Sequence, residues 1–89
     1  MQDRYLEITF RKGKPFAAYI YLSRMTGSTV STTKKFTEGI IADFDNENNV
    51  IGLEITSPAQ TPISAINDVL HQLHVSPISE QELAPLKAA

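Results

Sequence analysis

Five oxygen-bearing side chains recur at the spacing of a calcium-binding loop. Counted from the first carboxylate they occupy positions 1, 3, 5, 7 and 12, as ligands of an EF-hand loop do, and they are Asp43, Asp45, Glu47, Asn49 and Glu54. Position 6 is Asn48 instead of the glycine that makes the sharp turn, and the flanking segments alternate like strands, not like helices. We therefore expect no metal site here. Asp43 and Glu54 stay weak ligand candidates, opposite each other on the solvent side of a hairpin.

His71 and His74 are the other potential metal ligands. They fall on a segment with helical periodicity, where Asp68 lies on the same side as His71. Such a set can bind a transition metal, but it is common on solvated helix faces, which is the interpretation we favour. The chain has no cysteine, no nucleophile motif and no glycine-rich phosphate loop. We predict no catalytic residue, no metal and no cofactor.

Length and charge bound the remaining possibilities. The chain has 89 residues, 42% of them hydrophobic, and a net charge of −2, which predicts a single soluble domain over residues 1–89. No apolar run reaches the ~18 residues of a membrane span, and no signal pattern opens the chain, so we expect a cytoplasmic protein. A negative net charge predicts no nucleic-acid binding. Two lysine pairs, Lys12 with Lys14 and Lys34 with Lys35, form either a small basic edge or, as we favour, the charged protection of edge strands.

The first two thirds of the sequence have the alternating pattern of β-strands. Strands are predicted over residues 5–10, 16–22, 29–36, 40–44 and 50–56. The strongest local signal is the polar turn 45–49 between two alternating segments. Because the connections are short, we expect an antiparallel five-stranded β-meander spanning residues 5–56.

The period changes beyond Pro58. Apolar residues at spacings of three and four predict a helix over residues 61–74, with Thr61 as N-cap and Pro62 in the first turn. Ser79 and Glu82 have the spacing of a capping box, which predicts a short helix over 79–84. The expected fold class is therefore α+β, with one helix packed on one face of the sheet. The expected core is Leu6, Ile8, Ile20, Leu22, Ile40, Phe44, Leu53, Ile55, Ile66 and Leu70.

Strand alternation also predicts an unusual opposite face. Tyr19, Tyr21, Ile41 and Val50 are expected to share the side of the sheet that the helix leaves open. Tyrosines and aliphatic residues gathered on a solvated face indicate a binding patch. The alternative is that the loops or the C-terminal segment of the same chain cover it.

Three segments together resemble a small prokaryotic family. Residues 16–23 (FAAYIYLS), 38–45 (EGIIADFD) and 50–55 (VIGLEI) are similar to the corresponding strands of the family known as domain of unknown function 2283, over about residues 5–56. Asn48 and Asn49 stand where the family usually has a glycine. The family has no assigned activity, and some members look like the smaller partner of a toxin–antitoxin-like pair, which by analogy implies partner binding.

These observations favour a small non-catalytic interaction module, expected to form a homodimer or to bind another protein. The first alternative is an antitoxin-like regulatory partner of a small toxin, which follows from the resemblance. The second is a small enzyme or ligand binder that uses the Asp43 and Glu54 carboxylates.

Overall fold

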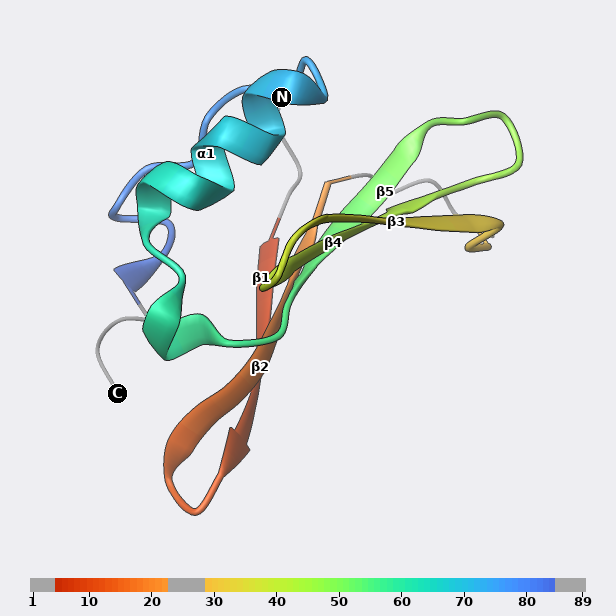
Figure 1. The fold of residues 1–89 in the computed structure, drawn as a ribbon. Coiled ribbons are helices and arrows are strands. Elements are labelled where there is room, and N and C mark those ends of the chain that lie inside the picture. Colours follow the sequence, from red (N-terminus) through yellow and green to blue (C-terminus); the bar gives the residue numbers. More distant parts are fainter. Residues whose placement is uncertain (1–4, 23–28, 85–89) are drawn as a thin grey trace.

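The computed structural model describes residues 5–22 and 29–84, and within them the predicted α+β architecture is confirmed. The strands are β1 (Tyr5–Arg11), β2 (Lys14–Tyr21), β3 (Thr32–Thr37), β4 (Ile40–Phe44) and β5 (Val50–Ile55). A 3-10 turn, η1 (Pro58–Gln60), leads into the helix α1 (Ile63–Gln72), which lies against one face of the sheet (Figure 1).

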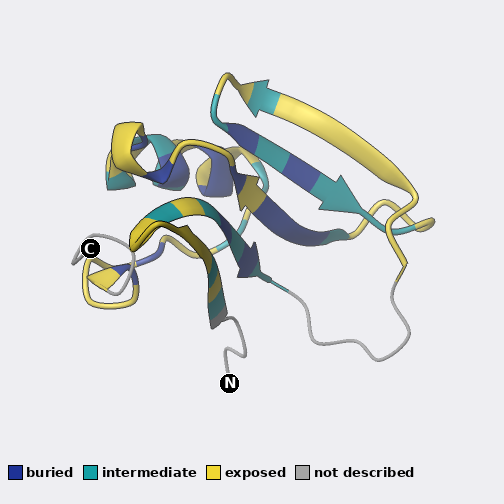
Figure 2. Cartoon of the chain, turned by 90° about the horizontal axis from the view of Figure 1, so that it is seen from below, coloured by how far each residue is buried: buried dark blue, intermediate teal, exposed yellow. Residues whose placement is uncertain are grey.

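All strand pairs are antiparallel, but the predicted meander order is wrong. The order across the sheet is β1-β2-β5-β4-β3, so β5 lies between β2 and β4, and β3 lies at the edge opposite to β1. The cause is burial. A meander would place β3 in the middle of the sheet, yet five of its six residues are exposed, whereas β4 and β5 are rich in buried residues (Figure 2). The observed order places the polar strand β3 at a solvated edge of the sheet, where its polar residues stay in water and cost the least free energy.

The core lies between the sheet and α1. Six of the ten predicted core residues are completely buried, namely Ile20, Ile40, Leu53, Ile55, Ile66 and Leu70. The other four pack against this cluster while partly exposed, and they are Leu6, Ile8, Leu22 and Phe44. The C-terminal segment adds Ile78 and Leu83, which the helical periodicity of the sequence does not reveal.

The helix is shorter than predicted at both ends. Pro62, not Thr61, is the N-cap, because the Thr61 hydroxyl donates a hydrogen bond to the Ser57 carbonyl (2.7 Å). At the other end His74 has a left-handed φ of 61°. The amide of His74 bonds to the His71 carbonyl and that of Val75 to the Leu70 carbonyl, which together form a Schellman motif that ends the helix.

Where a short helix over residues 79–84 is predicted, the structure has a turn over residues 80–83, and this segment is tied to α1. Ser79 and Glu82 form the expected capping box, since the amide of each donates to the side chain of the other (2.9 and 3.1 Å). Upstream of it, the Asn67 side chain accepts a bond from the Ile78 amide (2.7 Å) and donates one to its carbonyl (3.1 Å). This clamp holds Ile78 in the core.

Within the described residues, no helix is long and apolar enough to cross a membrane.

Candidate functional site: the outer face of the sheet

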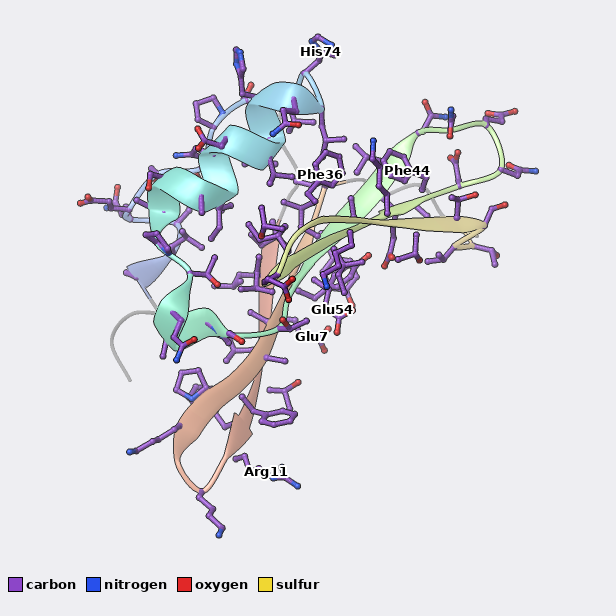
Figure 3. The ribbon with its side chains drawn as sticks, in the orientation of Figure 1. Glu7, Arg11, Phe36, Phe44, Glu54 and His74 are labelled. Atoms are coloured by element: carbon purple, nitrogen blue, oxygen red, sulfur yellow. The ribbon has the colours of Figure 1, made fainter. Side chains whose placement is uncertain are left out.

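The side of the sheet that faces away from α1, here called the outer face, carries an ordered set of tyrosines and carboxylates. Strand pairing aligns one row across all five strands, consisting of Glu7, Tyr19, Glu54, Ile41 and Lys35. The next row along four of the strands consists of Tyr21, Gly52, Asp43 and Thr33. Glu7 and Glu54 are seen on the side of the ribbon opposite to the helix in Figure 3.

Tyr19 crosses the sheet because a neighbouring strand offers no side chain at that point. A β-carbon on Gly52 would lie 2.7 Å from the Cζ atom of Tyr19 and 2.7 Å from the Ile20 carbonyl oxygen. The ring therefore occupies the space above Gly52, which is a known use of glycine inside a strand. From there the Tyr19 hydroxyl donates a hydrogen bond to Asp43 on β4 (2.8 Å).

A network of hydrogen bonds fixes the other polar groups of the outer face. The second carboxylate oxygen of Asp43 accepts a bond from the Thr33 hydroxyl on edge strand β3 (3.0 Å). The Tyr21 hydroxyl donates to Glu7 on β1 (2.7 Å). The rings of Tyr19 and Tyr21 meet edge to face, with centroids 4.7 Å apart. The hydrogen bonds of the two tyrosines join β1, β2 and β4, and the Thr33–Asp43 bond adds β3 to this network.

This environment keeps the Tyr19 hydroxyl protonated. Burial raises the pKa of Tyr19 far above its ordinary value, and the hydrogen bond to Asp43 and the charge of that carboxylate raise it further. Tyr19 is consequently a neutral donor at physiological pH and cannot act as a base.

The structure places three of the four predicted patch residues on the outer face and removes the fourth. Tyr19, Tyr21 and Ile41 are half-buried there, as the alternation predicts. Val50 packs against the core instead. Asp43 pairs with Gly52 but Phe44 pairs with Val50, so Ile51 is an extra residue in β5 and the bulge turns Val50 to the helix side.

The carboxylates of the EF-hand-like spacing have other roles. Asp43 pairs with Gly52 and Glu54 with Ile41, so the expected direct opposition of Asp43 and Glu54 is wrong, although both lie on the outer face. Asp45 accepts bonds from the amides of Asn49 and Glu47 (both 2.9 Å). The Asn49 amide is the largest cause of the lowered pKa of Asp45. Asp45 therefore organises the β4–β5 turn.

The histidine and lysine sets are also dispersed. His74 lies beyond the end of α1, at the top of the molecule in Figure 3, so it does not share a helical face with His71. In the part of the chain that the structure describes, no three acidic or histidine side chains are grouped to hold a metal. Lys12 and Lys14 lie at the turn of the β1–β2 hairpin, whereas Lys34 and Lys35 lie in β3, at the far edge of the sheet. The four lysines therefore form no common basic edge.

A cavity of about 400 Å³ lies away from the outer face. It is formed by the β3–β4 turn, η1 and the beginning of α1, and its lining includes Thr37, Glu38, Ser57, Gln60 and Thr61. Neither Asp43 nor Glu54 contributes to it. The two carboxylates considered for catalysis thus do not line this cavity.

Sequence reasoning missed three members of the outer face: Glu7, Thr33 and Gly52. The two-residue alternation that places Tyr19 on the outer face also applies to Glu7 in β1, so the sequence pattern could have identified Glu7. Gly52 carries a signal as well, because a glycine inside an otherwise apolar strand indicates the close approach of another group. The role of Thr33 depends on the pairing of β3 with β4, which the local sequence does not specify.

Comparison with known proteins gives one family. Residues 17–57 match the family described as protein of unknown function (DUF2283). The search of curated proteins and that of solved structures gave no match. The matched segment runs from β2 to just past β5, so it contains the tyrosines, Asp43, Gly52 and Glu54 of the outer face, while β1 with Glu7 lies outside it. Over residues 17–57 the chain is therefore similar to the DUF2283 family of proteins of unknown function.

Proposed function

We propose that this domain is a small non-catalytic interaction module that self-associates through its outer face. The observation that carries the proposal is the Tyr19–Tyr21 pair. Both rings are half-buried and oriented by hydrogen bonds on a face over which no described element lies. Hydrogen-bonded tyrosines lose little conformational entropy on binding, and their large rings suit an interface that is partly wet.

The chemistry of the outer face supports binding more than catalysis. The Asp43 oxygens accept hydrogen bonds from the hydroxyl groups of Tyr19 and Thr33, and Glu7 accepts one from the hydroxyl group of Tyr21. These carboxylates therefore already act as structural hydrogen-bond acceptors. A general base needs a geometry in which it reaches a substrate proton in a site that excludes water. An open sheet face provides the extended contact surface of a protein partner instead.

The size of the outer face predicts a weak complex. Five strands spaced about 4.8 Å apart and five to eight residues long present on the order of 500 Å². Two such faces together bury about 1,000 Å², which is at the low end of specific interfaces and typical of transient ones. We therefore expect a homodimer that forms at micromolar to millimolar concentration.

Sedimentation equilibrium over a concentration series tests this proposal. The wild type is expected to shift from monomer to dimer, and a Tyr21→Ser, Ile41→Ser double variant to dissociate at least about tenfold more readily. Val30→Ser is the matched control, because Val30 is an aliphatic residue that is 48% exposed outside the outer face. Urea unfolding of each variant verifies that the fold is retained.

Two results would contradict the proposal. A wild type that stays at 9.9 kDa up to millimolar concentration excludes self-association. A double variant that dimerises as well as the Val30→Ser control shows that another surface is used.

A further inference from the structure

The outer face continues along the β1–β2 hairpin into a region of opposite charge. Arg11 follows the alternation of Glu7 along β1, and it pairs with Lys14 across the two-residue turn. Glu7, Glu54 and Arg11 are all seen on the side of the sheet away from α1 (Figure 3). The acidic part of this surface is therefore followed, four residues further along the same strand, by a basic part.

The basic part lies on a projecting element with exposed aromatic surface. The hairpin tip, defined here as residues 11–16, extends well beyond the helix and the other strands (Figure 1). The Arg11 guanidinium lies over the Phe16 ring, 4.9 Å from its centroid, and Phe16 is 52% exposed. A large exposed ring beside cations indicates a contact surface more than a solvated turn.

The order of charges makes this surface complementary to itself. Thr9, which pairs with Ala17, lies midway between Glu7 and Arg11 in β1. Consider two copies whose outer faces meet and which are related by a twofold axis. This axis lies between the two faces, level with Thr9 and perpendicular to β1. Arg11 of each copy then comes to the level of Glu7 of the other. Glu7 and Arg11 are about 13 Å apart along a strand, so both contacts form together without bending the sheet.

We propose that the occupant of the outer face is the hairpin tip of a second copy of this chain. Arg11 and Lys14 of each copy face the acidic row of the other, and the exposed Phe16 rings lie near the twofold axis. The carboxylates nearest to the incoming tip are Glu7 and Glu54. This arrangement is isologous, so it closes as a dimer and does not propagate into a fibre. The inference rests on the function proposed above, since it specifies how the outer face is used.

A charge-exchange experiment on the full chain tests the pairing. In the face-reversed variant Glu7→Lys is combined with Glu54→Lys, and in the tip-reversed variant Arg11→Glu is combined with Lys14→Glu. Each variant alone sets like charges against each other, so its homodimer is expected to weaken at least about tenfold at low ionic strength. An equimolar mixture restores both attractive contacts, and a heterodimer of near wild-type affinity is expected, measured by sedimentation equilibrium with one variant labelled.

Matched controls separate this pairing from a general effect of net charge. Lys34→Glu reverses one cation on edge strand β3. Lys34 lies outside the outer-face row and on the opposite side of the sheet from the hairpin tip. Asp68→Lys with Glu80→Lys matches the face-reversed variant at exposed positions of α1 and the C-terminal turn. Neither control is expected to change the dimer dissociation constant by more than about threefold, because exposed charges distant from an interface are screened.

The outcomes distinguish this inference from the proposed function. A wild type that dimerises through the outer face, while the mixture shows no recovery, overturns the hairpin-tip pairing and leaves self-association intact. A monomeric wild type at every concentration overturns both. A tip that binds a DNA oligonucleotide or heparin while the chain stays monomeric assigns the basic residues to a polyanion and also overturns the inference.

Discussion

The position of Tyr19 is determined by three kinds of contact. Gly52 leaves room for the ring, Tyr21 meets it edge to face, and Asp43 accepts a hydrogen bond from its hydroxyl group. The sequence alone predicts that Tyr19 and Tyr21 share a face, because this follows from a period of two residues. It does not predict that Tyr19 reaches Asp43, since that contact depends on β5 separating β2 from β4.

Substitution of Gly52 by alanine is expected to destabilise the fold. The added β-carbon would lie 2.7 Å from the backbone carbonyl oxygen of Ile20, which cannot move aside as a side chain can. We expect a loss of about 1–3 kcal/mol in the free energy of unfolding, as for other overpacked sites. Urea unfolding measures it. An alanine variant as stable as the wild type would show that the ring of Tyr19 does not lie over Gly52.

Replacement of Tyr19 by phenylalanine keeps the ring and removes the hydroxyl. The lost bond to a charged acceptor is expected to cost about 1–2 kcal/mol at neutral pH. The pKa of Tyr19 is raised on folding, so its protonated form stabilises the native state below the ordinary value of about 10, and this contribution is lost as the pH rises further.

The pH dependence separates this role of Tyr19 from a purely steric one. Between neutral pH and about pH 11, the free energy of unfolding should fall more steeply in the wild type than in Tyr19→Phe. Parallel slopes in urea-unfolding series at several pH values would contradict the assigned hydrogen bond.

His74 and His71 have opposite backbone requirements. Substitution by glycine is therefore expected to change the stability of the protein in opposite directions at the two positions. His74 adopts a φ of 61°, where glycine is favoured, whereas His71 lies in the last turn of α1. We expect His74→Gly to stabilise the protein by about 0.5–1 kcal/mol and His71→Gly to destabilise it by about 1 kcal/mol. Thermal unfolding of both variants provides the comparison, and equal shifts of the same sign would argue against the Schellman end of the helix.

At the scale of elements, local sequence patterns predicted which segments form strands and which forms the helix. They did not predict how the strands are arranged in the sheet. The five strands, the helix and the capping box at Ser79 were all readable from alternation, helical period and cap residues. The strand order was not, because it depends on which strands share buried faces across the chain. The bulge at Ile51 was equally hidden, and it alone turned Val50 from the outer face to the core.

The attachment of the C-terminal segment to α1 is a contact that no sequence pattern predicts. Asn67 satisfies both backbone groups of Ile78 with one side chain, at 2.7 and 3.1 Å. Asn67→Ala leaves these groups without their partner and is expected to cost about 1–3 kcal/mol. Asn46→Ala, at an exposed position of the β4–β5 turn, is the control.

Hydrogen exchange at the Ile78 amide reports on the same clamp directly. Exchange at this position should accelerate in Asn67→Ala and remain unchanged in the control variant. Retained protection of Ile78 in Asn67→Ala would mean that packing of Ile78 and Leu83 suffices to hold the segment.

At the scale of the molecule, one layer of helix covers one face of a five-stranded sheet. The core therefore has a single apolar side (Figure 1). The opposite side carries the network of tyrosines and carboxylates that connects strands, and this is the face that we propose for binding (Figure 3). The sequence predicted this second face from the positions of Tyr19, Tyr21 and Ile41. Its acidic character at one end and basic character at the other emerged only with the strand register.

The central claim is that the outer face, and not the helix side, is where this chain associates. The most direct measurement is a dilution series of two-dimensional amide NMR spectra of the wild-type protein at low ionic strength. We predict concentration-dependent shifts for amides of β1 and β2, including Glu7, Arg11 and Tyr19, with those of α1 unchanged. Spectra independent of concentration up to the millimolar range, or shifts confined to α1, would contradict the claim.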